Sequence, residues 1–349
     1  MPTPPSIRSQ RRQSPTMRYV AQAAGVSQTA VSFVLNGRAD KEISKDTSER
    51  IWSAIHRLGY QPNAVAQSLR SGRSSLLGLV TDEIASTPYA VDIVRGAQDA
   101  AWTEGRILTL VNTNGQSRLQ TEAVAALVQH QVEGIIFAMM YHQEIVLPPV
   151  LRPGMPVVLV NCFSAAAGTR SVVPDEELGG YSAVQHLLRH GHRRIGFMNN
   201  IDPIPATVGR LAGYRRALKE ARIRHRANAV TQRVCNQQGG FDATLHLMAQ
   251  EPRPTALFCF NDLMAMGAYA ALQSLGLRIP EDVSVIGYDD MQLIAPNLRP
   301  ALTTMALPHY LMGRWGVEHL FSTGTAGQAL MPCALVERAS VAAPPPSSA

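Results

Sequence analysis

Residues 16–37 read TMRYVAQAAGVSQTAVSFVLNG, and this stretch decides the character of the N-terminal part of the chain. Its first apolar residues recur at helical spacing and end at Gly25, and Thr16 is placed to cap the helix that they form. Ser27 can cap a second short helix, which is broken around Asn36. Two short helices joined by a tight Gly-Val-Ser turn predict a helix-turn-helix headpiece.

A third helix is expected after this motif, where it would support the other two. Ser44 or Thr47 can begin it, apolar residues recur at helical spacing from Ile51, and Gly59 ends it. Three helices of this size are enough for a small all-α unit. We therefore place the headpiece at residues 16–62.

Segments without a core of their own are expected on both sides of the headpiece. Residues 1–15 are rich in proline, serine and arginine, which predicts a flexible basic arm. Residues 63–75 are predicted to form a hinge, in which Asn63 caps one short helix ending at Leu69 and SGRSS follows as a linker. Because such a short helix has little core, we expect it to form only against a partner helix or DNA.

The basic charge of the chain is confined to this N-terminal part. Residues 1–75 contain eleven Lys and Arg against four Asp and Glu, a net charge of +7. Residues 76–349 contain twenty-one against twenty-two, a net charge of −1. A small basic module on a neutral body is typical of a protein that binds a polyanion, and the alternative is a merely solvated basic tail.

Continuous apolar runs alternate with helical patterns from residue 76 onward. These runs lie at residues 76–80, 107–111, 134–138, 157–160, 195–198, 256–260 and 283–288. Because the runs are continuous, they predict buried parallel strands of the α/β class. Residues 76–340 exceed what one such sheet usually needs, so we expect two similar lobes, followed by a disordered tail at 341–349.

The composition excludes several classes of protein. A chain that is 46% hydrophobic and 17% charged is neither wholly disordered nor a fibre. Apolar runs are shorter than the roughly 20 residues that span a bilayer, and residues 1–30 lack a continuous apolar segment, so we expect no membrane span and no secretory signal. The four cysteines are scattered, which favours buried thiols in a reducing compartment and predicts a cytoplasmic protein.

Signals for an enzyme are weak. The sequence contains no Gly-x-Gly-x-x-Gly, Gly-x-x-x-x-Gly-Lys-Ser/Thr or Gly-x-Ser-x-Gly motif. His186, His190 and His192 resemble metal ligands, but they fall at an expected helix C-terminus, where histidine is ordinary. Asp289 and Asp290 are adjacent, so on an extended backbone their carboxylates point apart. We expect no catalytic residue, no metal and no cofactor.

Polar side chains follow several of the expected strands. They are Asp82, Asn161, Asn199, Asn261 and Asp289. In open parallel sheets ligands bind beyond the carboxyl ends of the strands, and a ring of amides and carboxylates suits a hydroxyl-rich or heterocyclic ligand. The alternative is that each residue only caps the helix that follows. Five such positions together favour a ligand cleft.

Long stretches of the sequence resemble the lactose/galactose repressor (LacI/GalR) family of bacterial transcription regulators. The headpiece and hinge carry AGVSQTAVSFVLNG and ISKDTSERIWSAIHRLGYQPNAVAQSLRSGRS, and DEELGGYSAVQHLLRHGHRRIGFM, GRLAGYRRAL, FCFNDLMAMGAYAAL, VSVIGYDD and PALTT follow in order. The resemblance covers residues 16–340. It implies a helix-turn-helix headpiece and hinge helix joined to a two-lobed effector domain like the periplasmic sugar-binding proteins, with two parallel sheets flanked by helices.

The resemblance also implies how the effector domain is divided. An N-subdomain would take residues 76–174 plus a segment after 302, and a C-subdomain would take residues 175–300. The chain would cross between them three times and so make a hinge around a cleft. Such a regulator is not an enzyme. Its rivals are a sugar-handling enzyme fused to a headpiece, which needs a glycine loop, and a free-standing solute-binding protein, which needs a secretion signal.

Most of the DNA-contacting residues that the resemblance implies lie on the second helix and in or next to the hinge. They are Arg18, Gln28, Thr29, Ser32, Phe33, Asn36, Tyr60, Asn63, Ala66 and Leu69. Glutamine can pair with adenine through two hydrogen bonds, and an apolar hinge residue can wedge into the minor groove. Phe33 replaces a frequent arginine, so it suits a thymine methyl group rather than guanine; the alternative is a core role.

Basic residues around the headpiece would contact phosphates and add salt-sensitive affinity. These are Arg18, Arg38, Lys41, Lys45, Arg70 and Arg73. The implied assembly is a homodimer on double-stranded DNA with a near-palindromic operator, at the bacterial nucleoid.

The effector contacts implied for the cleft come from both subdomains. Arg210, Asn261 and Asp289 match the family's positions for polar contacts, and Asp82, Tyr89 and Asn161 would contribute from the opposite lobe. A saccharide is the expected effector, and a purine or nucleoside is the alternative. We therefore predict a repressor whose operator affinity is controlled by a small molecule bound between two lobes.

Overall fold

The computed structural model describes residues 15–35, 43–61, 74–165, 168–224, 226–323 and 327–346. It forms two units, residues 1–74 and 75–349, and each is described here by itself. Most of the arm, most of the hinge and eight implied DNA contacts lie outside the described residues; these contacts are Asn36, Arg38, Lys41, Asn63, Ala66, Leu69, Arg70 and Arg73.

The N-terminal unit contains the expected three helices. They are α1 (Met17–Ala24), α2 (Gln28–Leu35) and α3 (Lys45–Leu58). Their shared core includes Val20, Val31 and Ile51, all fully buried. Gly25 ends α1 with φ of 66°, a conformation that glycine adopts without the steric cost that other residues pay, and so makes the tight turn.

Side-chain caps fix where the headpiece helices begin. The Ser27 hydroxyl accepts from the Ala30 amide at 3.1 Å, and Ser44 accepts from the Thr47 amide at 3.3 Å. Thr16 precedes α1 without a side-chain capping hydrogen bond. The Arg50 guanidinium donates to the Ala24 carbonyl at 3.3 Å, which ties α3 to the turn between α1 and α2.

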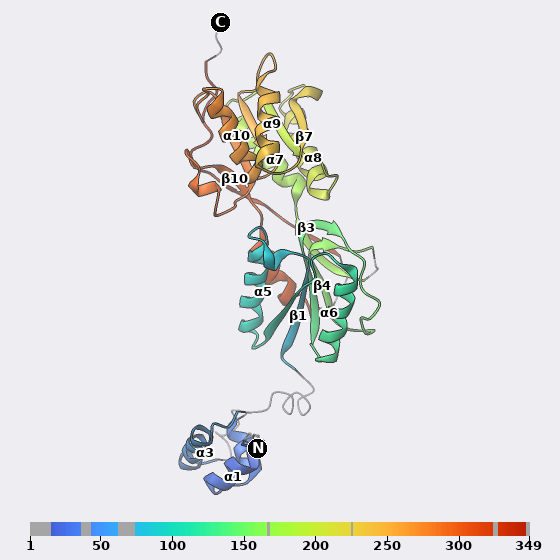
Figure 1. The fold of residues 1–349 in the computed structure, drawn as a ribbon, viewed down its shortest axis with the longest axis vertical. Helices are drawn as coiled ribbons and strands as arrows, with labels where there is room; N and C mark the ends of the chain where they lie inside the picture. The colour runs from blue at the N-terminus through green and yellow to red at the C-terminus, as the bar shows by residue number, and fades with distance from the viewer. Residues whose placement is uncertain are drawn as a thin grey trace, which may run out of the picture. The chain divides into compact units, whose positions relative to one another are not determined.

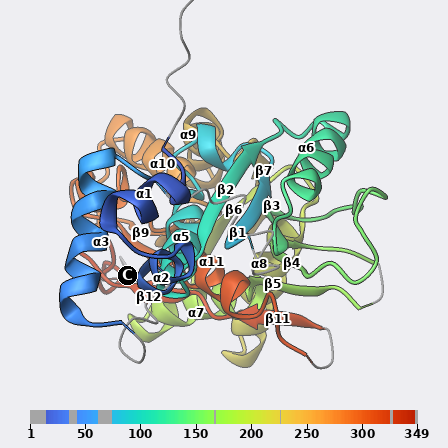
Figure 2. The same cartoon turned by 90° about the horizontal axis from the view of Figure 1, so that it is seen from below.

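The second unit contains two six-stranded sheets, one in each subdomain. The N-subdomain sheet has the order β11-β5-β4-β3-β1-β2, and all its pairs are parallel. Its strands are β1 (Leu76–Thr81), β2 (Ile107–Asn112), β3 (Gly134–Glu144), β4 (Val157–Phe163), β5 (Arg170–Pro174) and β11 (Gln328–Met331). Its helices are α5 (Val91–Thr103), α6 (Ser117–Gln129) and α11 (His309–Glu318). Helices α5 and α6 lie on opposite sides of β1 (Figures 1 and 2).

The C-subdomain repeats this plan with the sheet order β12-β10-β9-β8-β6-β7. Its strands are β6 (Ile195–Asn200), β7 (Val230–Arg233), β8 (Ala256–Cys259), β9 (Ser284–Asp289), β10 (Thr303–Ala306) and β12 (Ala334–Val336). Its helices are α7 (Glu176–Arg189), α8 (Pro205–Glu220), α9 (Gln237–Met248) and α10 (Asp262–Ser274). Only β12 is antiparallel to its neighbour. The expected α/β class with two parallel sheets is confirmed.

The segment after 302 that we assigned to the N-subdomain consists of α11 and β11. The C-subdomain extends beyond the expected residue 300, because β10 pairs with β9. The N-subdomain takes α11 and β11, and β12 returns to the C-subdomain sheet. The chain therefore passes between the subdomains at 174–176, 306–309 and 331–334.

The expectation of a disordered tail is wrong at its beginning. The Ala342 amide donates to Ser284 Oγ at 3.0 Å, and the Ala342 carbonyl lies 2.8 Å from His192 Nε2. These buried polar side chains need partners, and the backbone after β12 supplies them. Residues 347–349 lie outside the described part of the chain.

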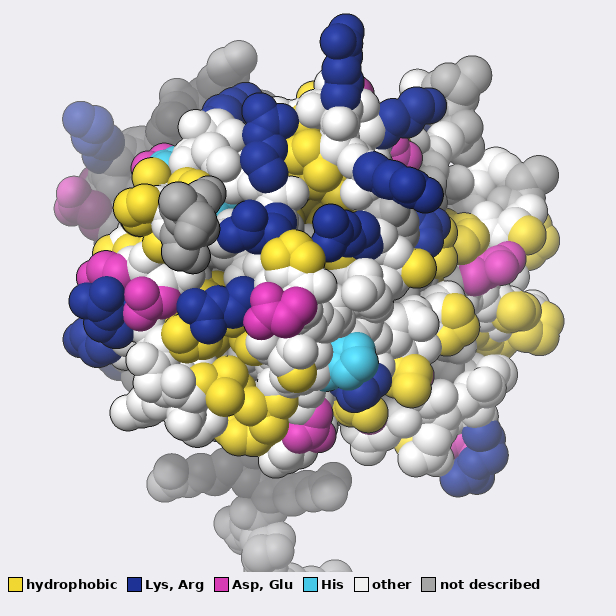
Figure 3. Space-filling view, turned by 90° about the horizontal axis from the view of Figure 1, so that it is seen from above, with side chains coloured by type: hydrophobic (Ala, Val, Ile, Leu, Met, Phe, Trp, Pro, Cys, Tyr) yellow, Lys and Arg dark blue, Asp and Glu magenta, His cyan; other side chains and the backbone are white. Residues whose placement is uncertain are grey.

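Basic side chains gather at the outer end of the C-subdomain. Arg193 and Arg194 precede β6 and Arg253 precedes β8; all three are exposed at the amino ends of parallel strands. Figure 3 shows Lys and Arg side chains spread over this end of the molecule. Residues 76–349 are therefore nearly neutral in total, although one of their faces is basic.

Of the helices in the described ranges, none is long and apolar enough to cross a membrane.

Candidate ligand pocket and headpiece surface

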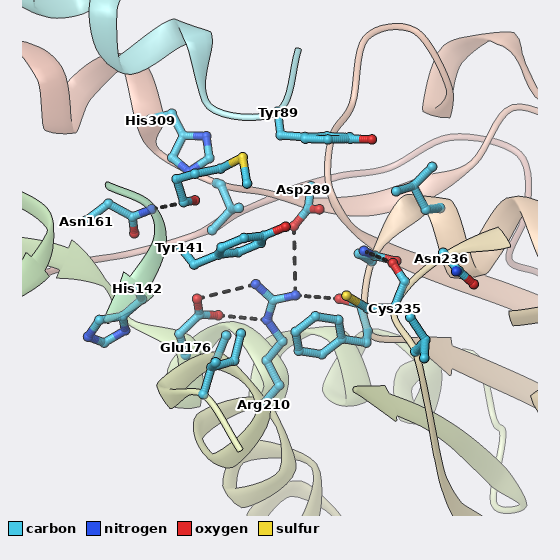
Figure 4. Close-up of a pocket in the computed structure, with 18 residues that line it drawn as sticks. Tyr89, Tyr141, His142, Asn161, Glu176, Arg210, Cys235, Asn236, Asp289 and His309 are labelled. Carbon is cyan, nitrogen blue, oxygen red and sulfur yellow. Dashed lines mark hydrogen bonds and ion pairs between the residues drawn. The ribbon is translucent and has the colours of Figure 1, made fainter. Parts of the chain in front are cut away.

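A cavity of about 290 Å³ lies between the two subdomains, at the carboxyl ends of their strands (Figure 4). The N-subdomain lines it with Tyr89, Met140, Tyr141, His142, Asn161 and His309. The C-subdomain lines it with Glu176, Arg210, Cys235, Asn236, Phe260, Asn261 and Asp289. The structure therefore brings together five of the six side chains that the family resemblance implied for the cleft.

Close packing of two helices creates the polar centre of the pocket. A Cβ atom on Gly180 of α7 would lie 2.5 Å from the Arg210 carbonyl oxygen, and one on Gly213 of α8 would lie 2.1 Å from the Glu177 carbonyl oxygen. Only residues without a side chain permit this approach. It places Glu176, at the start of α7, beside Arg210 of α8.

The Arg210 guanidinium is buried, and each of its three nitrogens donates a hydrogen bond to the protein. Nε donates to one oxygen of Glu176 at 2.8 Å, Nη2 donates to the other at 3.3 Å, and Nη1 donates to the Phe260 carbonyl. Its carbon Cζ lies 3.6 Å from the centroid of the Tyr288 ring. Burial by itself lowers the pKa of Arg210, but the facing Glu176 carboxylate, together with Tyr288 and Asp289, more than offsets this and raises it. Arg210 is therefore a fixed, neutralised cation.

Asp289 lies next to this pair, at the end of β9. Its Oδ1 is 3.8 Å from Arg210 Nη1, and its φ of 107° turns the backbone out of the strand direction. Burial raises the pKa of Asp289 well above its usual value, because it outweighs the attraction of Arg210. The hydroxyl end of Tyr141 points toward Asp289 from the other subdomain (Figure 4).

Two of the amides that line the pocket, Asn261 and Asn161, also hold its walls in place. Asn261 caps α10 by accepting from the Met264 amide at 2.9 Å, and it donates to the Cys235 carbonyl at 3.0 Å. Asn161 donates to the carbonyl oxygens of Met139 and Met140 at 2.9 and 3.0 Å. Helix capping, the alternative we gave for these positions, is thus correct for Asn261, although its side chain still lines the pocket.

Asp82 does not belong to the lining of this pocket. Its carboxylate accepts from the Met140 amide at 3.0 Å and from the Gln143 side chain at 3.3 Å. It also accepts from the Glu83 amide at 2.6 Å. These bonds join the ends of β1 and β3, so the predicted ligand contact is replaced by a structural role.

The sequence did not single out two histidines that line the pocket. His309 is buried, and its Nε2 has no hydrogen-bond partner among the described residues. Burial lowers the pKa of His309 to about 4, so the ring is neutral at pH 7. Burial also lowers the pKa of His142, and both of its ring nitrogens likewise lack a partner within the described ranges. No local motif marks either residue, since only the fold brings them to the cleft.

The stability of the wild-type protein should fall as the pH drops from 6.5 toward 4, in part through His309. In that window the unfolded ring takes up a proton at its ordinary pKa of 6.5, whereas the folded ring does not until about 4. Unfolding then binds a proton, so acid favours the unfolded state, by on the order of 2 kcal/mol at about pH 5.

Replacement of His309 tests this pH dependence of stability. The urea midpoint of His309→Asn should depend less on pH between 6.5 and 4 than that of the wild type. His130→Asn, at an exposed site beyond α6, is the control and should follow the wild type. An unchanged pH dependence in His309→Asn would contradict the assignment.

Helix α2 has one side exposed to solvent and the other packed in the headpiece core. Gln28 and Thr29 are exposed and Ser32 and Phe33 are partly exposed, whereas Val31 and Val34 on the same helix are buried. Phe33 lies outside the cluster of residues that forms the headpiece core, so the alternative of a core role is not supported. Arg18 and Lys45 are exposed as well. Tyr60 instead packs against the headpiece core.

Gln28→Ala should weaken specific operator binding by about 1–3 kcal/mol, the range for a side chain that pairs with one base through two hydrogen bonds. Binding to unrelated DNA should stay nearly the same, because phosphate contacts supply it. Gln22→Ala, at an exposed site on α1, is the matched control. Fluorescence anisotropy with operator and scrambled duplexes measures both; an equal loss on both duplexes would refute base reading by Gln28.

Two family models match the chain. One, described as periplasmic binding proteins and sugar binding domain of the LacI family, matches residues 74–335. The other, described as bacterial regulatory proteins of the lacI family, matches residues 16–63. The two matches correspond to the effector domain and the headpiece, and together they cover most of the chain.

Individual relatives agree with these models. The HTH-type transcriptional repressor PurR of Photorhabdus laumondii is 34% identical over 87% of this chain and 89% of its own length. PurR of Aliivibrio salmonicida is 31% identical over 87% and 91%. The Lac repressor dimer bound to operator and the anti-inducer ONPF has a TM-score of 0.78 at 28% identity and covers 95% of this chain and 100% of its own.

A LacI-family regulator from Rhizobium etli, 35% identical, has a TM-score of 0.71 over 77% of this chain and 100% of its own. The resemblance noted in the sequence is thereby confirmed. The family models match both the headpiece, at residues 16–63, and the two-subdomain body, at residues 74–335. The chain belongs to the LacI family of bacterial transcriptional regulators, with a helix-turn-helix DNA-binding headpiece and an effector-binding domain.

Proposed function

We propose that this regulator represses transcription as a homodimer on a near-palindromic operator, and that a neutral saccharide bound between the subdomains sets its operator affinity. The observation that carries the choice of ligand is the neutralised Arg210–Glu176 pair beside Asp289 in a cavity of about 290 Å³. We further propose that the protein acts in the cytoplasm on nucleoid DNA and catalyses no reaction.

The charge of the pocket argues for a neutral ligand. Glu176 already compensates Arg210, and the raised pKa of Asp289 brings that carboxyl closer to its neutral form. A phosphorylated or carboxylated effector would find no free cation here and would face two acidic side chains. Hydroxyl groups, by contrast, can donate to Asp289 and to the bare Nε2 of His309.

The size and the walls of the pocket agree with a small sugar. The volume is at the lower end of the range for small-molecule sites, roughly 300–1,000 Å³. Tyr89, Tyr141 and Phe260 add aromatic surface around the polar centre. Two similar structures are described with sugars: the CelR–cellobiose complex, 29% identical with a TM-score of 0.65, and an Enterococcus faecium regulator with bound ribose, 26% identical with a TM-score of 0.62.

A purine or nucleoside is the second candidate. Planar bases stack on aromatic rings, and the pocket offers three such rings from both subdomains. A base would also pair its N–H groups with Asp289 and His309. The two candidates differ in what they need: a sugar needs many hydroxyl partners, whereas a base needs one planar slot.

The coupling to DNA follows from linkage. An effector that contacts both subdomains favours one degree of closure over another, and it can shift the protein only by its difference in affinity for the two states. Closure would alter how the N-subdomains of a dimer pair, and hence whether the hinge segments at 63–75 can form paired helices on DNA.

Selection of binding sites from random duplex DNA with the full-length protein tests the DNA part of the proposal. We expect enrichment of a palindrome with a pyrimidine–purine step at its centre, since such steps unstack most easily. Enrichment of a single half-site would contradict a dimeric reader. Turnover of sugars or ATP by the same preparation would contradict the absence of catalysis.

A ligand screen tests the effector part. Neutral monosaccharides and disaccharides, sugar phosphates, purine bases and nucleosides are added to the protein on the selected operator. We expect a neutral sugar to raise the melting temperature and to change operator affinity. A response to sugar phosphates alone would overturn the argument from charge, and a response to purines alone would establish the second candidate.

A further inference from the structure

The end of α7 carries a cluster of metal-binding side chains outside the pocket. His186 and His190 lie four residues apart, and Glu337, just after β12, lies beside them. Each residue offers one ligand atom, and these three atoms all lie within 4.8 Å of one another. From the sequence we interpreted His186, His190 and His192 as ordinary residues of a helix C-terminus and expected no metal. In the fold, His192 lies in the core, bonded to Thr255 and Ser284, and Glu337 takes the third place beside the other two.

The His186 ring is buried with an unused nitrogen. Only 4% of the residue is exposed, and Nε2 has no hydrogen-bond partner among the described residues. A buried polar atom without a partner costs free energy, which a ligand at this position would recover.

His190 is oriented as a metal-binding histidine usually is. Its Nδ1 lies 2.9 Å from the His186 carbonyl oxygen, so the hydrogen sits on Nδ1 and the lone pair is left on Nε2. Metal-bound histidines almost always donate their other N–H group in this way, which fixes the tautomer and the ring. The two rings lie side by side, with centroids 4.5 Å apart.

Two imidazoles and one carboxylate form a ligand set typical of Zn²⁺, with water as the fourth ligand. Ligand atoms around tetrahedral zinc are about 3.3 Å apart, given bonds of roughly 2.0–2.1 Å. Small side-chain rotations therefore suffice from the present positions. The neighbouring Arg189 opposes cations held by charge alone, which disfavours Mg²⁺ and Ca²⁺.

We propose that His186, His190 and Glu337 bind Zn²⁺ or another divalent metal that prefers imidazole. The metal joins α7 to the segment after β12, where the chain has returned to the C-subdomain. Arg338, the next residue, pairs with Asp290 at 2.7 Å, so this segment also braces the end of β9. Bound metal thus holds the last crossing of the chain in place.

The test uses full-length protein treated with a chelator and then titrated with Zn²⁺ by calorimetry. We expect one equivalent to bind and to raise the melting temperature. His190→Ala and Glu337→Gln should each weaken Zn²⁺ binding at least tenfold. Because His190 is half-buried and Glu337 is exposed, both variants should keep the fold, which circular dichroism can verify. Mg²⁺ at the same concentration should have no effect.

Two controls separate this site from other ligands of zinc. His246→Ala removes an exposed histidine from the last turn of α9, the place equivalent to His186 on α7, and should bind like the wild type. Cys235→Ser removes the half-buried thiol and should also bind like the wild type. Equal Zn²⁺ affinity in the wild type, His190→Ala and Glu337→Gln, or loss of binding in Cys235→Ser alone, would overturn the proposal.

Discussion

The Asp289→Ala variant should bind operator like the wild type but lose its response to the effector. Arg210 hydrogen-bonds Glu176, whereas Asp289 lies 3.8 Å from it and can still accept from a ligand. Removal of Asp289 therefore deletes the acceptor for the ligand's hydroxyl or N–H groups. Loss of one partner of a buried hydrogen bond to a charged group costs about 2–5 kcal/mol, so effector affinity should fall by about 30-fold or more.

The neighbouring residue provides the matched control. Asp290 pairs with Arg338 instead of lining the pocket, and its side chain is similarly inaccessible, 15% exposed against 22% for Asp289. Asp290→Ala should therefore keep the effector response. Operator release is measured by anisotropy across an effector titration. A normal response in Asp289→Ala, or an equal loss in both variants, would show that the cleft has been assigned wrongly.

The Glu176→Ala variant should be destabilised by about 3–5 kcal/mol, the usual cost when one partner of a buried ion pair is removed. The side chains of Arg210 and Glu176 are 4% and 6% exposed, so the guanidinium would stay largely buried without its counter-ion. The urea midpoint of the effector domain should shift accordingly. Arg210 would keep the Phe260 carbonyl, the weaker contact with Asp289 and the face of the Tyr288 ring.

Glu177→Ala serves as the control, one residue further along α7. Glu177 pairs with Arg216 at 2.6 Å, but these side chains are 48% and 39% exposed, and such surface pairs contribute at most about 1 kcal/mol. If both glutamate variants lose the same free energy of unfolding, burial does not make the Arg210–Glu176 pair more stabilising than the exposed Arg216–Glu177 pair.

The local pattern of the sequence was sufficient to predict most of the elements. Apolar runs such as 134–138 and 195–198 are fully buried strands, and Ser27, Ser44 and Asn261 cap helices as their residue types favour. The short strands β5, β7, β10, β11 and β12 were missed. Strands β7, β11 and β12 are partly exposed and lie at sheet edges, so pairing rather than hydrophobicity defines them. Strands β5 and β10 are buried but only four or five residues long, too short to stand out as apolar runs.

Pocket residues could be predicted where a family motif contains them, and were missed where only the folded chain brings them to the pocket. Arg210 and Asp289 stand out in the sequence because the family motifs contain them. Glu176 lines the same pocket only because two glycine-bearing helices pack closely, and His309 reaches it only after the second crossing of the chain. Asp82 has the right type and position in the sequence, yet the end of β3 takes up its carboxylate.

The three crossings between subdomains have a consequence for how the protein is made. Helix α11 and strand β11 belong to the N-subdomain but are encoded after nearly all of the C-subdomain. A growing polypeptide therefore emerges from the ribosome with the N-subdomain sheet lacking its β11 edge until synthesis has passed residue 331. The headpiece can fold early in translation, whereas both subdomains of the effector domain are complete only near its end. Half-made chains thus have a DNA-binding end without its regulatory body.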